Sequence, residues 1–99
     1  MKIERKTALN GELYWVLLDG DTPVFISEMY KTEAQRDNGI EAFIANRLQK
    51  HKIKTQVNGS YYAAFNASNN ALIGITKSVN TLSEIKDLIN HIQAIDIDD

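Results

Sequence analysis

The feature of this sequence that most constrains its fold is an internal repeat. Asn10-Gly11-Glu12-Leu13-Tyr14 returns as Asn58-Gly59-Ser60-Tyr61-Tyr62, and each copy continues through an apolar stretch into a segment with helical spacing of apolar residues. Self-similarity at about half the chain length is typical of tandem structural units. The sequence therefore predicts two β-rich units, each of which ends in one helix.

Turn residues divide each unit into three short strands. Asn-Gly is the preferred pair of a type I′ hairpin, because both central residues of that turn need a positive φ. We therefore expect a hairpin at Asn10-Gly11 and another at Asn58-Gly59, and a second turn follows in each unit. The strands are expected at residues 3–8, 13–18, 23–27, 53–57, 61–65 and 71–76.

Two threonines mark the expected starts of the helices. Thr32 with Gln35, and Thr81 with Glu84, have the spacing of a capping box, and apolar residues then recur every three or four positions to about residues 50 and 94. Gly59 follows Gly11 by 48 residues, whereas Thr81 follows Thr32 by 49. We place the extra residue in the turn between the second and third strands, because an insertion within a strand would turn later side chains to the other face.

Composition limits the classes of protein that remain. The 99 residues suit one domain, which we divide into repeats at 1–51 and 52–95 and an acidic tail at 96–99 that we expect to be disordered. Cysteine is absent, which excludes disulfides and thiolate metal sites, and a net charge of −2 argues against a general nucleic-acid binder. With neither a signal-peptide pattern nor an apolar run near ~20 residues, we expect a soluble cytoplasmic protein.

Short motifs recur in the same order in both units. The first unit contains Asn10-Gly11, Ser27-Glu28-Met29-Tyr30 and Asn38-Gly39-Ile40, and the second has Thr76 and Val79 where the first has serine and tyrosine. In this arrangement the chain resembles the YegP-like family, small bacterial proteins with one or two βββα motifs. The resemblance implies an α+β fold in which one antiparallel sheet has both helices on one face, about a pseudo-twofold axis. It implies no known activity.

Alternation along the second strand assigns side chains to the two faces of the sheet. Leu13, Trp15 and Leu17 are predicted to face the helices, and we expect Trp15 to fill the space over Gly39. The opposite face is then too apolar for a freely solvated surface, which indicates a binding face. Its predicted binding residues are Tyr14, Val16, Phe25 and Tyr62. The alternative is that loops, tails or neighbouring side chains cover this band.

The charged residues provide only weak candidates for binding, metal or catalytic sites. Arg47, Lys50, Lys52 and Lys54 form a basic cluster that could contact phosphate, although such clusters are usually solvated. Arg36 could bind an anion or an acidic group at the sheet rim, but we expect its stem to be packed and its guanidinium group to lie in water. His91 and Asp87 lie one helical turn apart without a nucleophile near them in the sequence, so catalysis is not expected. The tail residues Asp96, Asp98 and Asp99 could hold a cation only weakly.

These observations predict a non-enzymatic protein-interaction or self-associating module. The alternative is a binder of a small ligand or of single-stranded nucleic acid that uses aromatic residues and the basic helix end. We expect no cofactor, no metal site and no membrane segment, and a protein partner rather than nucleic acid.

Overall fold

The chain forms eight elements in the order βββα, twice. The computed structural model describes residues 1–48 and 51–99. The first repeat contains β1 (Lys2–Thr7), β2 (Leu13–Asp19), β3 (Thr22–Ser27) and α1 (Glu33–Asn46). The second contains β4 (His51–Thr55), β5 (Tyr61–Asn66), β6 (Leu72–Thr76) and α2 (Leu82–Ala94). The predicted α+β fold is confirmed. The first helix, expected to continue to about residue 50, ends at Asn46, and residues 49 and 50 lie outside the described residues.

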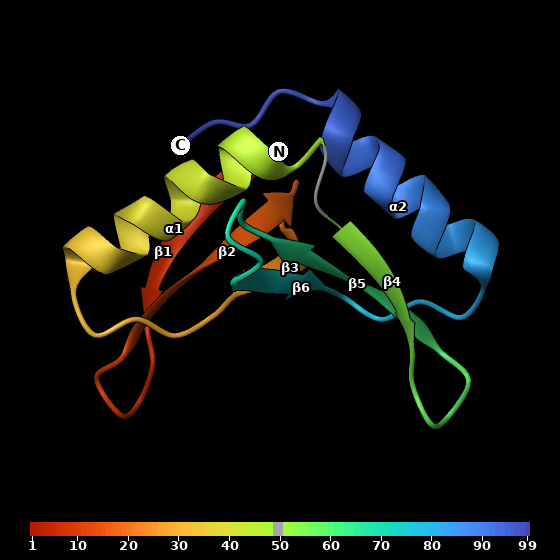
Figure 1. Cartoon of the computed structure of the whole chain (residues 1–99), viewed down its shortest axis with the longest axis horizontal. Coiled ribbons are helices and arrows are strands. Elements are labelled where there is room, and N and C mark those ends of the chain that lie inside the picture. Colours follow the sequence, from red (N-terminus) through yellow and green to blue (C-terminus); the bar gives the residue numbers. More distant parts are fainter. Residues whose placement is uncertain (49–50) are drawn as a thin grey trace.

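One antiparallel sheet joins the two repeats, with the strand order β1-β2-β3-β6-β5-β4. The halves meet where β3 pairs with β6, and Ile26 lies opposite Ile75. These two residues occupy equivalent positions in the repeats, so this pair lies on the pseudo-twofold axis. Both helices cover the same face, and the hairpins β1–β2 and β4–β5 diverge below it, so that the helix-free face forms the inside of an arch (Figure 1).

The hairpin turns differ from the predicted type I′. Within the described residues Asn70 is the one non-glycine with positive φ, whereas Gly11 and Gly59 both have φ of 84°. The amide of Gly11 donates to the carbonyl of Ala8, which is a type I turn followed by a left-handed glycine. Asn10 contributes its side chain instead, because its Oδ1 accepts from the amide of Glu12.

The inserted residue lies in the predicted turn. Asp19 pairs with Thr22, which leaves two residues between β2 and β3. In the second repeat the amide of Ala67 donates to the carbonyl of Ala71, which leaves three residues in the loop. Because this loop lies at the sheet margin, the additional residue alters no side chain within a strand.

The expected caps begin both helices. Oγ1 of Thr32 accepts from the amide of Gln35, and Oγ1 of Thr81 accepts from the amide of Glu84, each at 3.1 Å. These bonds satisfy one of the amides that a helix leaves unpaired at its start. Neither described helix is long and apolar enough to cross a membrane.

The core lies between the sheet and the helices and contains four packed aromatic rings. Trp15, Phe25, Phe43 and Phe65 have ring centroids between 4.7 and 5.7 Å apart. Trp15 is fully buried on the helix side, as alternation predicted. Because Phe65 comes from the second repeat and the other three rings from the first, the repeats share one interior.

The position of Phe25 corrects the predicted composition of the open face. Phe25 is 2% exposed and lies in the core, not on the helix-free face. Leu17 pairs with Phe25 but Leu18 pairs with Pro23, so Val24 is an additional residue in β3. This bulge reverses the alternation that follows it and turns Ile26 to the open face.

The contact predicted at Gly39 is also wrong. A Cβ atom built on Gly39 would lie 2.6 Å from Cζ of Tyr30, and its three nearest heavy atoms all belong to Tyr30, none to Trp15. Tyr30 is held there because its amide and carbonyl pair with those of Leu13 at the margin of β2. Gly39 therefore leaves the space in which the tyrosine hydroxyl packs directly against the backbone of α1.

The acidic tail is ordered, contrary to expectation. The amide of Ile3 donates to the carbonyl of Asp98 at 2.8 Å, and the amide of Asp98 donates to the carbonyl of Met1 at 2.9 Å. Asp98 forms a parallel bridge with Lys2. The tail therefore lies along the outer edge of β1, and the two chain ends are neighbours (Figure 1).

Candidate functional site

A row of side chains crosses the helix-free face, with one residue from each strand. In strand order the row contains Glu4, Val16, Ile26, Ile75, Ala64 and Lys52. Val16 is only 5% exposed although no helix covers it, whereas Ile26 is 40% exposed. Neighbouring side chains therefore cover part of the apolar band, as one alternative predicted. Ile26 remains as exposed apolar surface on this face.

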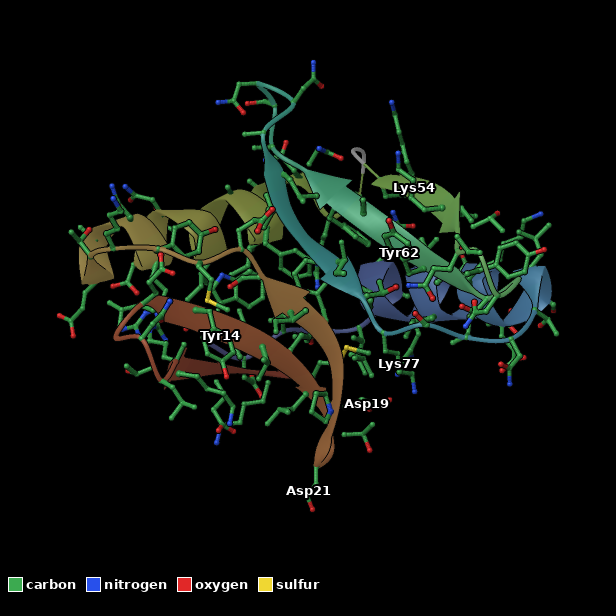
Figure 2. The ribbon with its side chains drawn as sticks, turned by 90° about the horizontal axis from the view of Figure 1, so that it is seen from below. Tyr14, Asp19, Asp21, Lys54, Tyr62 and Lys77 are labelled. Atoms are coloured by element: carbon green, nitrogen blue, oxygen red, sulfur yellow. The ribbon has the colours of Figure 1, made fainter. Side chains whose placement is uncertain are left out.

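Two tyrosine–lysine pairs flank this row. Tyr14 lies opposite Lys6 of β1, and Tyr62 lies opposite Lys54 of β4. The pairs are repeat equivalents, because both members differ by 48 residues. Both tyrosines are half-buried, and Figure 2, viewed from below, shows Tyr14, Tyr62 and Lys54 on the open face.

The two tyrosines lie diagonally across the face. Tyr14 and Tyr62 are separated by three strand spacings, or about 14 Å, and by four residues along the strands, or about 13 Å. The direct separation in a flat sheet is therefore about 20 Å. One ligand must be extended to contact both rings.

Each pair borders a hollow on the open face. The larger hollow, of about 710 Å³, is lined by Lys52, Lys54, Tyr62 and Ile75 among others. The smaller, of about 380 Å³, is lined by residues that include Lys6, Tyr14, Val16, Ile26 and Lys77. Among their described lining residues neither hollow includes an aspartate or a glutamate.

Lysine ammonium groups on this face are mostly without carboxylate partners. Nζ of Lys6 lies 3.1 Å from Oε1 of Glu4. In the second repeat Lys52 occupies the position of Glu4, so the corresponding ion pair cannot form. Within residues 1–48 and 51–99, Lys52, Lys54 and Lys77 form no ion pair. Positive charge is thus concentrated on one face of a chain whose net charge is −2.

The predicted basic cluster is divided by the fold. Nη1 of Arg47 donates to the carbonyl of Ile95 at 2.8 Å and thereby closes the end of α2. The predicted cluster residue Lys50 lies outside the described residues. Of the described cluster residues, Lys52 and Lys54 line the larger hollow on the open face and Arg47 does not.

Of the two histidines, His51 borders the larger hollow beside Tyr62, whereas His91 lies on α2 and lines neither hollow. Nε2 of His91 lies 3.4 Å from Oδ2 of Asp19, and no ion pair with Asp87 is present. His51 packs against Phe65, with ring centroids 5.7 Å apart. No group of three or more His, Asp or Glu residues in the described part of the chain could hold a metal ion.

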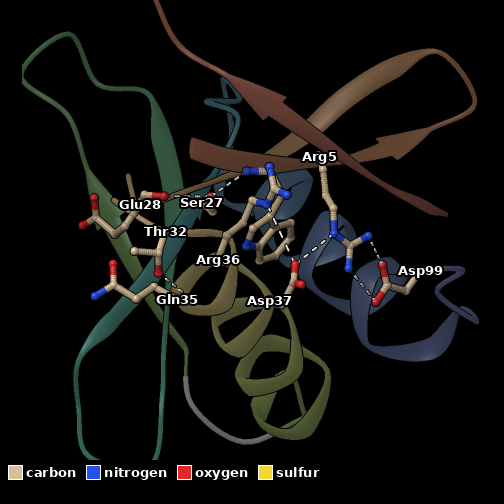
Figure 3. Close-up of polar contacts among 9 residues, drawn as sticks. Arg5, Ser27, Glu28, Thr32, Gln35, Arg36, Asp37 and Asp99 are labelled. Carbon is tan, nitrogen blue, oxygen red and sulfur yellow. Dashed lines mark hydrogen bonds and ion pairs between the residues drawn. The ribbon is translucent and has the colours of Figure 1, made fainter. Parts of the chain in front are cut away.

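A second charged cluster lies beside α1. Figure 3 shows Asp37 between the guanidinium groups of Arg5 and Arg36. Nε of Arg5 lies 3.0 Å from Oδ1 of Asp37, and its Nη1 lies 2.6 Å from Oδ1 of Asp99. Hydrogen bonds to these carboxylates raise the pKa of Arg5. Arg36 is only 8% exposed, so it does not extend into water as predicted. The cluster joins the tail to the helix and is structural.

Two buried hydroxyl groups, on β3 and β6, accept hydrogen bonds from backbone amides of β2 and β5. Oγ of Ser27 accepts from the amide of Trp15, and Oγ1 of Thr76 accepts from the amide of Ala63, each at 2.9 Å. In each case a side-chain hydroxyl accepts the hydrogen bond that a backbone carbonyl of the neighbouring strand would otherwise accept. The serine motif was visible in the sequence, but the change to Thr76 in the second repeat concealed that both residues have the same role.

Comparisons with known proteins agree with this fold. Residues 8–50 match a family model described as "Domain of unknown function (DUF1508)". A UPF0339 protein from Shewanella oneidensis, solved by NMR, has a TM-score of 0.84 and 19% identity over 98% of this chain and 88% of that one. YegP of E. coli, a protein of unknown function, has a TM-score of 0.84 and 20% identity over 98% and 90%. None of the curated proteins compared matches the chain.

The solved structures and the family model support different conclusions. At 19% and 20% identity the solved structures establish the fold alone. The family model matches the first repeat, which contains Tyr14 and its strand, but not the second. Together, the fold and the match of the first repeat support the assignment of this chain to the YegP-like family, whose function is unknown.

Proposed function

We propose that this chain is a non-enzymatic binding module whose helix-free sheet face binds an extended anionic ligand. Single-stranded nucleic acid is the ligand class that best fits the residues of this face. The observation that supports the proposal is the repetition of one tyrosine–lysine pair, Lys6 with Tyr14 and Lys54 with Tyr62, on the two sides of the arch.

The pairs provide the two interactions that such a ligand needs. The ring of either tyrosine can stack on a base, and the ammonium group of Lys54, which forms no ion pair with a described residue, can contact a phosphate, whereas that of Lys6 already pairs with Glu4. Between the pairs, Ile26 and Ile75 provide an apolar surface for the intervening nucleotides. Because the rings are about 20 Å apart, one strand has to be unstacked and extended to contact both.

The same geometry disfavours self-association and the binding of an extended peptide on this face. A second copy placed face to face would bring Lys6, Lys54 and Lys77 of both copies together, and like charges repel. A peptide lying across the face would find no backbone partners, because the amides and carbonyls of a sheet point along its plane. A phosphodiester chain has no backbone donors that need to be satisfied.

A partner protein with an acidic surface is the second candidate. The observation that favours it is the exposure of two apolar residues on this face, Ile26 at 40% and Leu72 at 41%. Such a partner would contact these residues and pair its carboxylates with the lysines. Its binding would depend less steeply on salt than that of a polyanion, because fewer counterions are released.

Fluorescence anisotropy with a labelled oligothymidylate of about 12 nucleotides tests the first candidate. Tyr62→Ala removes one stacking surface, which is worth ~1–3 kcal/mol, so the affinity should fall about 5- to 150-fold. Lys54→Glu should weaken binding and reduce the salt slope. Lys31→Glu makes the same charge change at an exposed residue before α1, outside both hollows, and should have a much smaller effect.

Two results would contradict the nucleic-acid proposal. One is equal affinity in the Tyr62, Lys54 and Lys31 variants, which would mean that binding does not involve the face. The other is capture of an acidic protein that requires Tyr62 while the oligonucleotide fails to bind, which would establish the second candidate instead.

A further inference from the structure

The outer edge of β1 shows how this fold holds an added strand. The tail lies parallel to β1, with backbone hydrogen bonds between Ile3 and Asp98 and between Asp98 and Met1. Ile97 packs against the core, and Asp99 pairs with Arg5 at 2.6 Å. The part of the edge around Ile3 is thus covered by a segment in which acidic and apolar residues alternate.

The equivalent edge of the second repeat, on β4, is not covered by any described segment. The amide of Tyr61 donates to the carbonyl of Val79, and the amide of Ala63 donates to Thr76, so both point away from β4. Their partners across the ladder, Thr55 and Ile53, therefore form non-hydrogen-bonded pairs and direct their own amides and carbonyls outward. In the described residues no segment pairs with this edge.

A hollow lies beside this edge on the helix side. It has a volume of about 310 Å³ and is lined by His51, Ile53, Lys86, Ile89, Asn90 and Gln93. Ile53 is 36% exposed. A strand added to β4 would direct every second side chain towards this hollow, where Ile53 and Ile89 form an apolar floor.

Charges around the edge select the added strand. Lys52 and Lys54 lie on the open-face side of β4, and Lys86 lies on the helix side. An incoming strand therefore meets ammonium groups on both of its faces and should contain carboxylates. The β4 strand of a second copy would instead bring its own Lys52 and Lys54 to the same edge, which disfavours self-pairing.

We propose that the outer edge of β4 binds an extended acidic and apolar peptide of a partner protein by strand addition, as β1 holds residues 96–99. This site uses the edge and the hollow below α2. It does not depend on a ligand at the tyrosine pairs.

The test uses a labelled peptide with the sequence of residues 94–99, Ala-Ile-Asp-Ile-Asp-Asp, and the ¹⁵N-labelled full chain. Binding should shift the amide signals of Ile53 and Thr55 and the side-chain amide of Gln93. The signals of Ile26 and Ile75 should not move. This pattern separates the proposal from binding at the open face.

A proline substitution tests the backbone bonds directly. Thr55→Pro removes an outward amide and no bond of the β4–β5 ladder, so peptide affinity should fall at least about fivefold. Thr7→Pro removes the corresponding outward amide of β1, because its partner Leu13 donates to Tyr30, and it should leave the affinity unchanged. Lys86→Glu, on the exposed side of α2, should also weaken binding and does not alter the backbone.

Several outcomes would overturn the proposal. Equal affinity in the Thr55, Thr7 and Lys86 variants would place the peptide elsewhere. Shifts at Ile3 without shifts at Ile53 would mean that the peptide only displaces the chain's own tail. A dimer by light scattering that Thr55→Pro dissociates would mean that a second copy occupies the edge. Equal affinity for a peptide with lysine in place of aspartate would refute the selection by charge.

Discussion

Gly74 is the residue at which the two repeats cannot be identical. It occupies in β6 the position that Phe25 occupies in β3, 49 residues earlier. A Cβ atom built on Gly74 would lie 2.8 Å from both Cε1 and Cζ of Phe25, and it would overlap the carbonyl oxygen of Ile26. We therefore predict that Gly74→Ala destabilises the protein by forcing β3 and β6 apart at the junction between the repeats.

The geometry sets the size of the effect. Carbon atoms pack best at about 3.5–4.0 Å, so the added methyl group is too close to the ring by ~1 Å. Overpacking costs about 1–3 kcal/mol, and replacement of glycine within a strand returns about 0.5–1 kcal/mol. Because a backbone carbonyl cannot rotate away, the cost should be near the upper limit, for a net loss of ~2 kcal/mol and a fall in Tm of about 8–16 °C.

Urea unfolding and calorimetry of Gly74→Ala measure this loss, with Gly39→Ala as the matched control. At Gly39 the obstacle is the ring end of a half-buried tyrosine, which can tilt, and the helix gains ~1 kcal/mol from alanine. The control should therefore remain within about 1 kcal/mol of the wild type. A Gly74→Ala protein as stable as the control would refute the close approach of β3 and β6.

Two further predictions concern buried polar groups. Ser27→Ala leaves the amide of Trp15 buried without an acceptor, and Thr76→Ala does the same to the amide of Ala63. Each should therefore lower the free energy of unfolding in urea by about 1–3 kcal/mol, whereas Thr76→Ser should lower it less. A loss as small as that of an exposed substitution would contradict this role. Burial raises the pKa of Tyr30 above its ordinary 10.0, so its stabilising contribution is complete below about pH 10 and is lost as pH rises. Tyr30→Phe should therefore lose less stability than the wild type as the pH rises above 10.0, and equal losses would count against this contribution of Tyr30.

Local patterns in the sequence predicted most of the secondary structure. The Thr32 and Thr81 caps depend on residues three positions away, and the hairpins depend on a glycine within each turn. The position of the inserted residue also followed from the sequence, because two repeats of one chain provide their own alignment. Where the sequence erred, at the type I′ turn, the asparagine satisfied the turn through its side chain instead of its backbone.

Identification of the candidate site depended on strand pairing between residues that are apart in the sequence. Tyr14 and Tyr62 were predicted on the open face by alternation, but their partners Lys6 and Lys54 became visible only with the register of the strands. Arg47 is close to Lys52 in sequence, yet the fold directs it to the end of α2. Neighbours in sequence separate because the chain changes direction between a helix and a strand.

The sequence by itself determined the duplication, the order of the elements and the face of the sheet to which Trp15 points, since each follows from residues a few positions apart. Only the tertiary structure decided that Phe25 lies in the core, that Gly74 must be small and that the edge of β4 is open. The position of Phe25 depends on a bulge, and the small size required at residue 74 depends on its contact with Phe25, 49 positions away. The edge of β4 has no partner among the described residues because the tail pairs with β1 instead. No local pattern in the sequence records contacts between residues so far apart.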